Sequence, residues 1–217
     1  MSKRSGRGEL TRLRIIRVAA DLFHKQGVHL TSPDEIIETS GTGKGQFYHY
    51  FKNKEGLVHE VLLTHLDAIK TDAAPIHYEI KSWPDLEQWF LSQIALQKKY
   101  NMARGCPFGT IGNEVTESDE LIRQDLSLIF EVMKNKLAKF FVMEKAKGRL
   151  LPEAHEDYLA DFCIAVIQGA MLMGKIKRKS HPSEATVREA MKHLQRYMAH
   201  PSGSRQKEES GRSSKMH

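Results

Sequence analysis

The feature that most constrains this chain is a pair of short helix patterns separated by a glycine-containing break. The run Ser32-Pro33-Asp34-Glu35 supplies a serine N-cap, a proline at the first helical position and a glutamate three residues after the cap. Together these residues predict the start of a helix. Gly41-Thr42-Gly43 interrupts that helix soon afterwards. A second helix is predicted to start near Lys44, and it carries Phe47 and Phe51 on one face.

Helical periodicity continues on both sides of this pair. Before it, a helix is predicted from about Leu10 to Gly27, a residue typical of a helix C-terminus. Its expected apolar face is Leu13, Ile16, Ala20 and Phe23. After the pair, a helix is predicted over about residues 53–71. Its expected apolar face is Leu57, Val61, Leu62, Leu66 and Ile69.

The remainder of the chain also has helical periodicity. Helices are predicted over about 84–102, 118–147, 152–179 and 182–200, with a glycine-rich interruption at 104–112. No strand-like alternation and no internal repeat is evident. The sequence therefore predicts an all-α fold.

Positive charge is concentrated at the ends of the chain. Residues 1–56 carry ten Lys and Arg against six Asp and Glu, whereas residues 57–200 carry nineteen of each. A basic N-terminal region (the head) before a neutral remainder (the body) favours binding of a polyanion by the head. A basic terminus that binds no partner would give the same count of charged residues. We expect a flexible basic arm at 1–8, a polyanion-binding head domain at 9–56, a helical body domain at 57–200 and a disordered tail at 201–217.

Several classes of protein are disfavoured. The chain contains no uninterrupted apolar run of membrane-spanning length and no apolar stretch behind its charged N-terminus. Cys106 and Cys163 lack the spacing of metal ligands or of a disulfide framework. His59 and His65 are six residues apart, which puts them on different helix faces. We expect a cytoplasmic protein with no metal, no cofactor, no membrane partner and no catalytic site.

Two short helices joined by a tight turn have the layout of a helix-turn-helix, whose second helix enters the major groove of DNA. If Phe47 points into the core, the groups that point outward are those of Lys44, Gln46, Tyr48 and His49. A glutamine can pair with adenine through two hydrogen bonds, and Lys44 and Gln46 lie in the first turn, which reaches base edges. Tyr48, His49 and Lys54 are expected to reach flanking phosphates.

The head also resembles the DNA-binding signature of the TetR family. The resemblance lies in TSPDEII at 31–37, in GTGKGQFYHYFKNKEGL at 41–57 and in the helix before them, and it covers about residues 10–66. It implies groove contacts by Lys44, Gln46 and Tyr48. It implies that backbone contacts are made or supported by Ser32, Thr42, His49, Tyr50 and Lys54. The polar run Glu38-Thr39-Ser40 departs from the family pattern, and Gly45 has no side chain with which to read a base.

Two rival interpretations involve nearby residues. The segment Gly41–Gly45 resembles a phosphate-binding loop, but Glu38 stands where that motif needs glycine and Gly45 stands where it needs serine or threonine. Cys106, within a Gly-Cys-Pro segment, could act as a nucleophile or a thiol sensor, whereas a small buried side chain at a helix break is the more common reason for such a cysteine.

The family resemblance further implies a cavity for a small apolar ligand, although an ordinary core would explain the same residues. The candidate lining residues are Met102, Cys106, Phe108, Phe130, Met133, Phe162 and Met171. We expect a homodimer that packs through its two C-terminal helices. The candidate interface residues are Phe162, Val166, Gly169, Met173, Val187, Leu194 and Tyr197, all of which an intramolecular core would equally explain.

These features predict a transcriptional repressor that is released from a palindromic operator by its ligand. A ligand-independent architectural DNA-binding protein is the alternative, since it would share the head and differ only in the body. The sequence does not identify the operator, the ligand or the regulated genes.

Overall fold

The computed structural model describes residues 3–199 of the 217-residue chain, and it confirms the all-α prediction. None of the described residues forms a strand beyond one isolated bridge between Leu150 and Met198. The tail expected at 201–217 lies outside the described residues, as do the side chains of Lys3, Arg4 and Arg7. The helices of the described residues are α1 (Lys3–Gln26), α2 (Pro33–Ser40), α3 (Lys44–Tyr50), α4 (Lys54–Lys70), α5 (Trp83–Lys98), α6 (Pro107–Gly112), α7 (Glu120–Ala146), α8 (Glu156–Lys177) and α9 (His181–Gln195).

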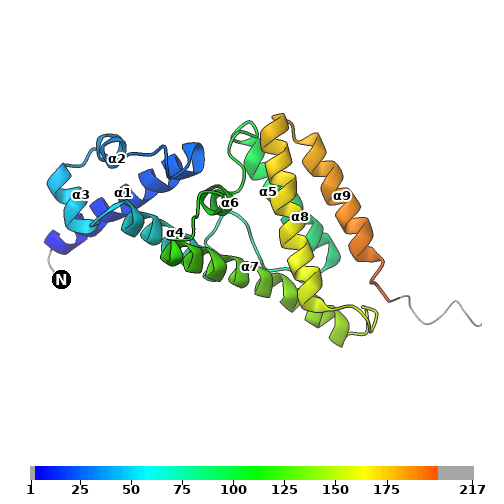
Figure 1. The fold of residues 1–217 in the computed structure, drawn as a ribbon. Coiled ribbons are helices and arrows are strands. Elements are labelled where there is room, and N and C mark those ends of the chain that lie inside the picture. The colour runs from blue at the N-terminus through cyan, green and yellow to red at the C-terminus, as the bar shows by residue number, and fades with distance from the viewer. Residues whose placement is uncertain (1–2, 200–217) are drawn as a thin grey trace, which may run out of the picture.

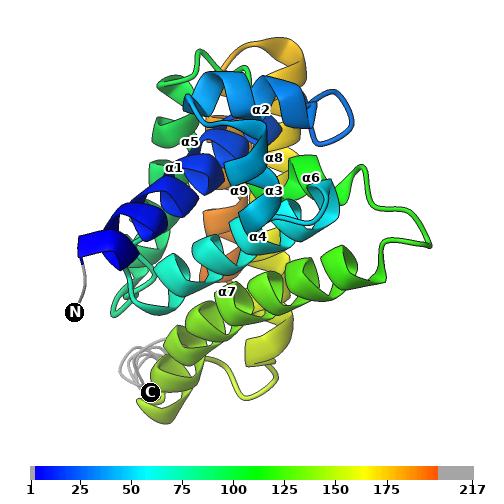
Figure 2. The same ribbon diagram turned by 90° about the vertical axis from the view of Figure 1, so that its left-hand side faces the viewer.

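The helices form two connected units (Figure 1). We call α1–α3 the head and α4–α9 the body. The head occupies one end of the molecule, and α5, α8 and α9 occupy the other. Helix α4 packs against α1 in the head and against α7 in the body. Figure 2, which views the molecule from the head side, shows α7 alongside α4 and α8 and α9 behind the head.

The buried face of α1 differs slightly from the predicted one. Ile15 and Ala19 are fully buried and Phe23 is nearly so, whereas Leu13 is 44% exposed. The prediction of Leu13 as a core residue was therefore wrong, because the buried stripe is centred on the Ile15–Ala19 edge of the helix. The helix also begins at Lys3 rather than near Leu10.

Side-chain capping explains where α2, α4 and α5 begin. The Asn53 side chain accepts a hydrogen bond from the Gly56 N–H at 2.8 Å at the start of α4, and Ser82 does the same for Asp85 at the start of α5. Gly148 has a φ of 67° just after α7, as a left-handed C-terminal residue requires. All five residues predicted for the apolar face of α4 are buried.

The C-terminal helix boundaries differ from the prediction. Helix α8 begins at Glu156 rather than at Pro152, because the chain turns at residues 152–153, where the Ala154 N–H donates to the Leu151 carbonyl at 3.0 Å. Residues 149–151 pair with the chain after α9. The Leu151 N–H donates to the Tyr197 carbonyl and the Ala199 N–H donates to the Arg149 carbonyl, each at 2.9 Å. The same pairing follows the end of α9 at Gln195. The interruption at 104–112 contains the short helix α6.

Candidate DNA-binding surface and interior cavity

The turn between α2 and α3 is fixed by local hydrogen bonds. The Ser32 hydroxyl accepts from the Glu35 N–H at 3.1 Å, as the capping box predicted. At the other end of α2, Gly41 adopts a left-handed conformation with φ of 61°. The hydroxyls of Ser40 and Thr42 are 2.8 Å apart and both residues are buried, so Thr42 stabilises the turn from inside.

The two faces of α3 are divided as the sequence predicted. Phe47 is fully buried and Phe51, which follows the helix, is 2% exposed. Tyr48 is 51% exposed. Lys44, Gln46 and His49 are exposed as well. The helix thus presents an ammonium, an amide, a phenol and an imidazole to the outside of the head.

The exposed groups of the head are held only by weak contacts. The Lys44 ammonium lies 2.9 Å from a carboxylate oxygen of Asp34, and both side chains are about 70% exposed. Such an exposed ion pair contributes little stability, so Lys44 can exchange this partner for a phosphate or a base. The half-buried Tyr50 directs its hydroxyl toward Gly8 at the start of α1. Tyr50 thus lies between α3 and α1, where it can hold the exposed face of α3 in position.

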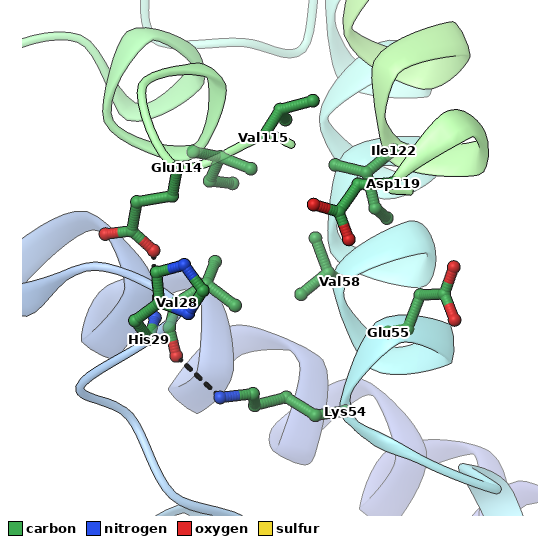
Figure 3. Close-up of a pocket in the computed structure, with 10 residues that line it drawn as sticks. Val28, His29, Lys54, Glu55, Val58, Glu114, Val115, Asp119 and Ile122 are labelled. Atoms are coloured by element: carbon green, nitrogen blue, oxygen red, sulfur yellow. Dashed lines mark hydrogen bonds between the residues drawn. The ribbon is translucent and has the colours of Figure 1, made fainter. Parts of the chain in front are cut away.

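Lys54 does not point freely outward, which corrects one expectation. Its ammonium donates to the Val28 carbonyl at 2.9 Å and to the Thr31 carbonyl at 3.4 Å. Figure 3 shows the bond to Val28. The lysine begins α4, and the two carbonyls belong to the loop between α1 and α2. In this conformation the Lys54 ammonium links that loop to the start of α4. A DNA phosphate that contacts Lys54 would have to share the ammonium with the two carbonyls.

The same region joins the head to the body. The Glu114 carboxylate, which follows α6, accepts a hydrogen bond from the His29 N–H at 2.8 Å (Figure 3). Gly27 lies directly against this carboxylate, and a Cβ at that position would overlap it. A small cavity of about 150 Å³ lies beside these groups, lined also by Lys54 and Asp119. Glu114 therefore fastens the end of α1 to the body.

A larger, partly open cavity of about 320 Å³ is lined by residues of α1, α4, α5 and α8. Four predicted ligand residues line it, namely Cys106, Phe108, Met133 and Met171. The other three do not. Phe130 packs behind Phe108 with the ring centroids 6.4 Å apart, Met102 is buried against Gly174, and Phe162 packs against His193 of α9. Phe130 and Phe162 lie on helix faces that do not line the cavity, and Met102 lies in the turn after α5.

Sequence reasoning missed most polar groups of this cavity. They are His24, His65, Tyr78, Gln93, Gln97, Tyr100 and Gln168. They come from α1, α4, α5, α8 and the intervening loops, so no local spacing in the sequence marks them as a set. The missed feature with the largest consequence is that α1 of the head forms part of the wall.

The interior histidines are held in their neutral form. The His24 Nε2 atom lies 2.8 Å from the Gly105 carbonyl oxygen. Burial lowers the pKa of both His24 and His65 below the ordinary histidine value, because a buried imidazolium loses its hydration. Burial likewise raises the pKa of the Tyr78 phenol. At neutral pH these three side chains contribute hydrogen-bonding groups without charge.

The chemical alternatives find no support in the described residues. Burial raises the pKa of the Cys106 and Cys163 thiols, which favours the unreactive protonated form. Within residues 3–199, no group of three His, Cys, Asp or Glu side chains is arranged to hold a metal ion. His59 instead lies 2.6 Å from a carboxylate oxygen of Asp125 on α7.

Sequence models of two families match this chain. The model described as bacterial regulatory proteins of the tetR family matches residues 15–61. The model described as the tetracyclin repressor-like C-terminal domain matches residues 84–191. The first match contains the α2–α3 surface, the second spans most of the body, and together they cover more than half of the chain. The chain belongs to the TetR family. It is therefore a DNA-binding transcriptional regulator and not an enzyme.

Proteins similar in sequence to this TetR-family chain are named as transcriptional regulators. It is 29% identical over 179 residues to an HTH-type transcriptional regulator in the lacX 3' region of Lactococcus lactis, covering 76% of this chain and 84% of the relative. It is 25% identical over 173 residues to the HTH-type transcriptional repressor DhaR of a Mycobacterium species, covering 79% and 85%.

Solved structures of TetR-family proteins have the same fold. The regulatory protein TetR from Rhodobacter sphaeroides superposes with a TM-score of 0.75 at 23% identity, over 88% of this chain and all of that one. A TetR-family regulator from Agrobacterium tumefaciens gives a TM-score of 0.76 at 18% identity, also over 88% of this chain and all of that one. At these identities the likeness concerns the fold alone.

The expected interface residues of this TetR-family chain fall into two groups. Val187 and Leu194 are 1% and 0% exposed, so they pack inside the body, and their assignment to a surface was wrong. Met173 is 42% exposed and Gly169 is exposed, while Phe162, Val166 and Tyr197 are half-buried. The outer face of α8 carries further exposed apolar side chains that the sequence analysis did not select, namely Tyr158, Leu172 and Ile176.

Proposed function

We propose that this protein is a repressor that binds a palindromic operator as a homodimer and releases it when a small, largely apolar molecule enters the 320 Å³ cavity. The observation that carries the proposal is the division of α3, with Phe47 buried and Gln46 and Tyr48 exposed. We assign the cytoplasm as its place of action, since that is where a bacterial regulator meets its DNA.

In this proposal α3 is the recognition helix. Lys44, Gln46 and Tyr48 contact bases, because they lie on the exposed face and in the part of the helix that enters the groove first. Ser32, His49, Tyr50 and Lys54 contact or support the phosphate backbone, and Thr42 acts indirectly by holding the turn. A Cβ added at Gly43 or Gly45 would meet no atom within 4 Å, which supports a surface that DNA approaches closely.

In this proposal the second copy of the chain binds to the outer face of α8. Leu172 is 48% and Ile176 is 66% exposed on a helix whose opposite face is buried in the body. By length and composition alone α8 is also apolar enough to cross a membrane, a property shared by core helices of soluble proteins. We propose that a partner subunit covers this face. A dimer is also what a head that contacts few base pairs needs to select one site.

The release mechanism is supported by the position of the cavity. Its volume lies at the lower end of the range of small-molecule sites. Its wall includes α1 of the head, so a bound molecule touches both units. An architectural DNA-binding protein without a ligand remains the alternative. A well-packed body without a cavity would have favoured that alternative.

Selection of bound sequences from random duplex DNA tests the proposal. We expect a palindrome whose half-sites are spaced by about one helical turn, roughly 34 Å, or a multiple of it. Gln46→Ala should relax one base position in each half-site, while Gln124→Ala, at an exposed position on α7, should leave the selected sequence unchanged. Recovery of random sequences by the unaltered protein would refute operator recognition.

A further inference from the structure

His24, near the C-terminal end of α1, makes a hydrogen bond with a defined direction beside the cavity. His24 lines the cavity, and its Nε2 atom lies 2.8 Å from the Gly105 carbonyl oxygen. Because a carbonyl only accepts, Nε2 carries the hydrogen and donates. The donor belongs to the head and the acceptor to the segment before α6. The bond therefore crosses from the DNA-binding unit to the body at the edge of the cavity.

Neighbouring contacts make this a localised clasp. The Arg104 guanidinium lies 2.5 Å from an Asp21 carboxylate oxygen of α1, and it also stacks over the Tyr100 ring at 4.2 Å. The His24 and Tyr100 rings meet edge to face with centroids 5.5 Å apart. We call the contacts of Asp21 and His24 with residues 100–105 the α1 clasp. Anything that enters the cavity beside His24 lies against it.

The charges around the cavity restrict what can enter. Among the described residues that line it, only Asp21 carries a formal charge at neutral pH, and its side chain is 59% exposed and paired with Arg104. The remaining polar groups are imidazoles, phenols, amides and a thiol. A buried anion would find no cation among the lining residues, and a buried cation would have to compete with Arg104 for Asp21. Since burying an unpaired charge is strongly unfavourable, the cavity selects uncharged molecules.

We propose that the effector is an uncharged, mainly apolar alcohol or phenol whose hydroxyl inserts between His24 and the Gly105 carbonyl, and that this insertion detaches α1 from the body. The inference rests on the proposed function, because it names the chemical class of the effector and the contact through which it lowers DNA affinity.

A hydroxyl fits this position because it both donates and accepts. It accepts from His24 Nε2–H and donates to the Gly105 carbonyl, so both groups keep a partner. An ether or a ketone would satisfy His24 and leave the carbonyl without a donor, which carries a free-energy penalty. Insertion also replaces one hydrogen bond by two in series, so His24 must move away from Gly105, and α1 moves with it.

The binding test uses the full chain without DNA and probes of known structure. Calorimetry compares 1-octanol, 4-tert-butylbenzyl alcohol and 2-naphthylmethanol with the methyl ether, carboxylate and primary ammonium of each skeleton. We expect at least one alcohol to bind about tenfold more tightly than its methyl ether, which is the effect of leaving one buried polar group unpaired. We expect the carboxylates and ammoniums to bind more weakly still.

The coupling test compares a cavity histidine with a histidine outside the cavity. His24→Phe keeps a ring and removes the donor, while His181→Phe makes the same change at an exposed position at the start of α9. With the selected operator, the alcohol should lower DNA affinity of the unaltered protein and of His181→Phe by about five- to 150-fold, the usual range of allosteric coupling. In His24→Phe the alcohol should still bind, and the change in DNA affinity should fall below about twofold. Circular dichroism confirms that both variants are folded.

Each outcome decides a separate point. Equal affinity for alcohols and their ethers, tighter binding of a charged probe, or no binding by any probe would overturn the assigned chemical class. A response that survives in His24→Phe would overturn the clasp. Failure to select an operator would refute the proposed function, and the calorimetric comparison would still decide the chemical class.

Discussion

At the scale of the residue, the junction between head and body depends on Gly27. Its φ of 89° is a conformation that side chains other than glycine rarely adopt, and a Cβ there would overlap the Glu114 carboxylate. Gly27→Ala should therefore lower the free energy of unfolding by about 2 kcal/mol or more, from backbone strain together with the displaced carboxylate. Urea denaturation measures the loss. Gly45→Ala is the matched control, because its Cβ meets open space within a helix, and it should not destabilise.

The two cavity histidines give a residue-level prediction for pH. The folded protein holds His24 and His65 at a lowered pKa, whereas the unfolded chain protonates near the ordinary histidine pKa of 6.5. The unfolded state thus binds more protons as pH falls, so the stability from these groups is present above about pH 6.5 and is lost below it. Urea denaturation between pH 7.5 and 6 should show this decline. The double variant His24→Phe, His65→Phe should flatten it, and an unchanged slope would contradict the assignment.

At the scale of the element, local signals in the sequence carried most of the information. The capping box at Ser32 and the glycine at 41 fixed α2, and the i, i+4 pair Phe47 and Phe51 fixed which side of α3 is exposed. The cavity was only partly predictable, since its wall joins residues such as His24 and Gln168 that are distant in the chain. The start of α8 was missed because the chain turns at residues 152–153 after residues 149–151 pair with the segment that follows α9, and periodicity reports neither feature.

The start of α4 yields an element-level prediction. Lys54→Met removes the ammonium that binds the Val28 and Thr31 carbonyls and keeps the apolar stem. We expect a loss of about 1–2 kcal/mol in the free energy of unfolding, because the lysine is only half-buried, together with weaker binding to all DNA sequences. Lys52→Met, at an exposed position, should leave stability unchanged. If the two variants unfold at the same urea concentration, the role of Lys54 in holding the α1–α2 loop is refuted.

At the scale of the whole molecule, the surfaces for DNA and for the second copy lie at opposite ends. In Figure 1, α3 lies toward one end of the molecule, and α8 and α9 lie toward the other. The cavity lies between these surfaces, with walls from α1 on one side and α8 on the other. A molecule bound there contacts both the unit that reads DNA and the helix proposed to join the subunits. In the proposed function, this placement lets a molecule in the cavity act on α3 without any direct contact with it.

The last prediction concerns assembly. Ile176 is 66% exposed on the outer face of α8, and burial of such a face by a partner would be driven by its apolar area. Ile176→Glu places a charge in that interface, so the protein should change from dimer to monomer while its helix content is retained. It should lose operator affinity by at least about 100-fold, because a single head contacts only one half-site. Leu121→Glu alters an apolar side chain of α7 that is 41% exposed, and it should remain dimeric. Sedimentation velocity with circular dichroism distinguishes these results. A dimeric Ile176→Glu, or a monomeric unaltered protein that still selects a palindrome, would place the second subunit on a different surface.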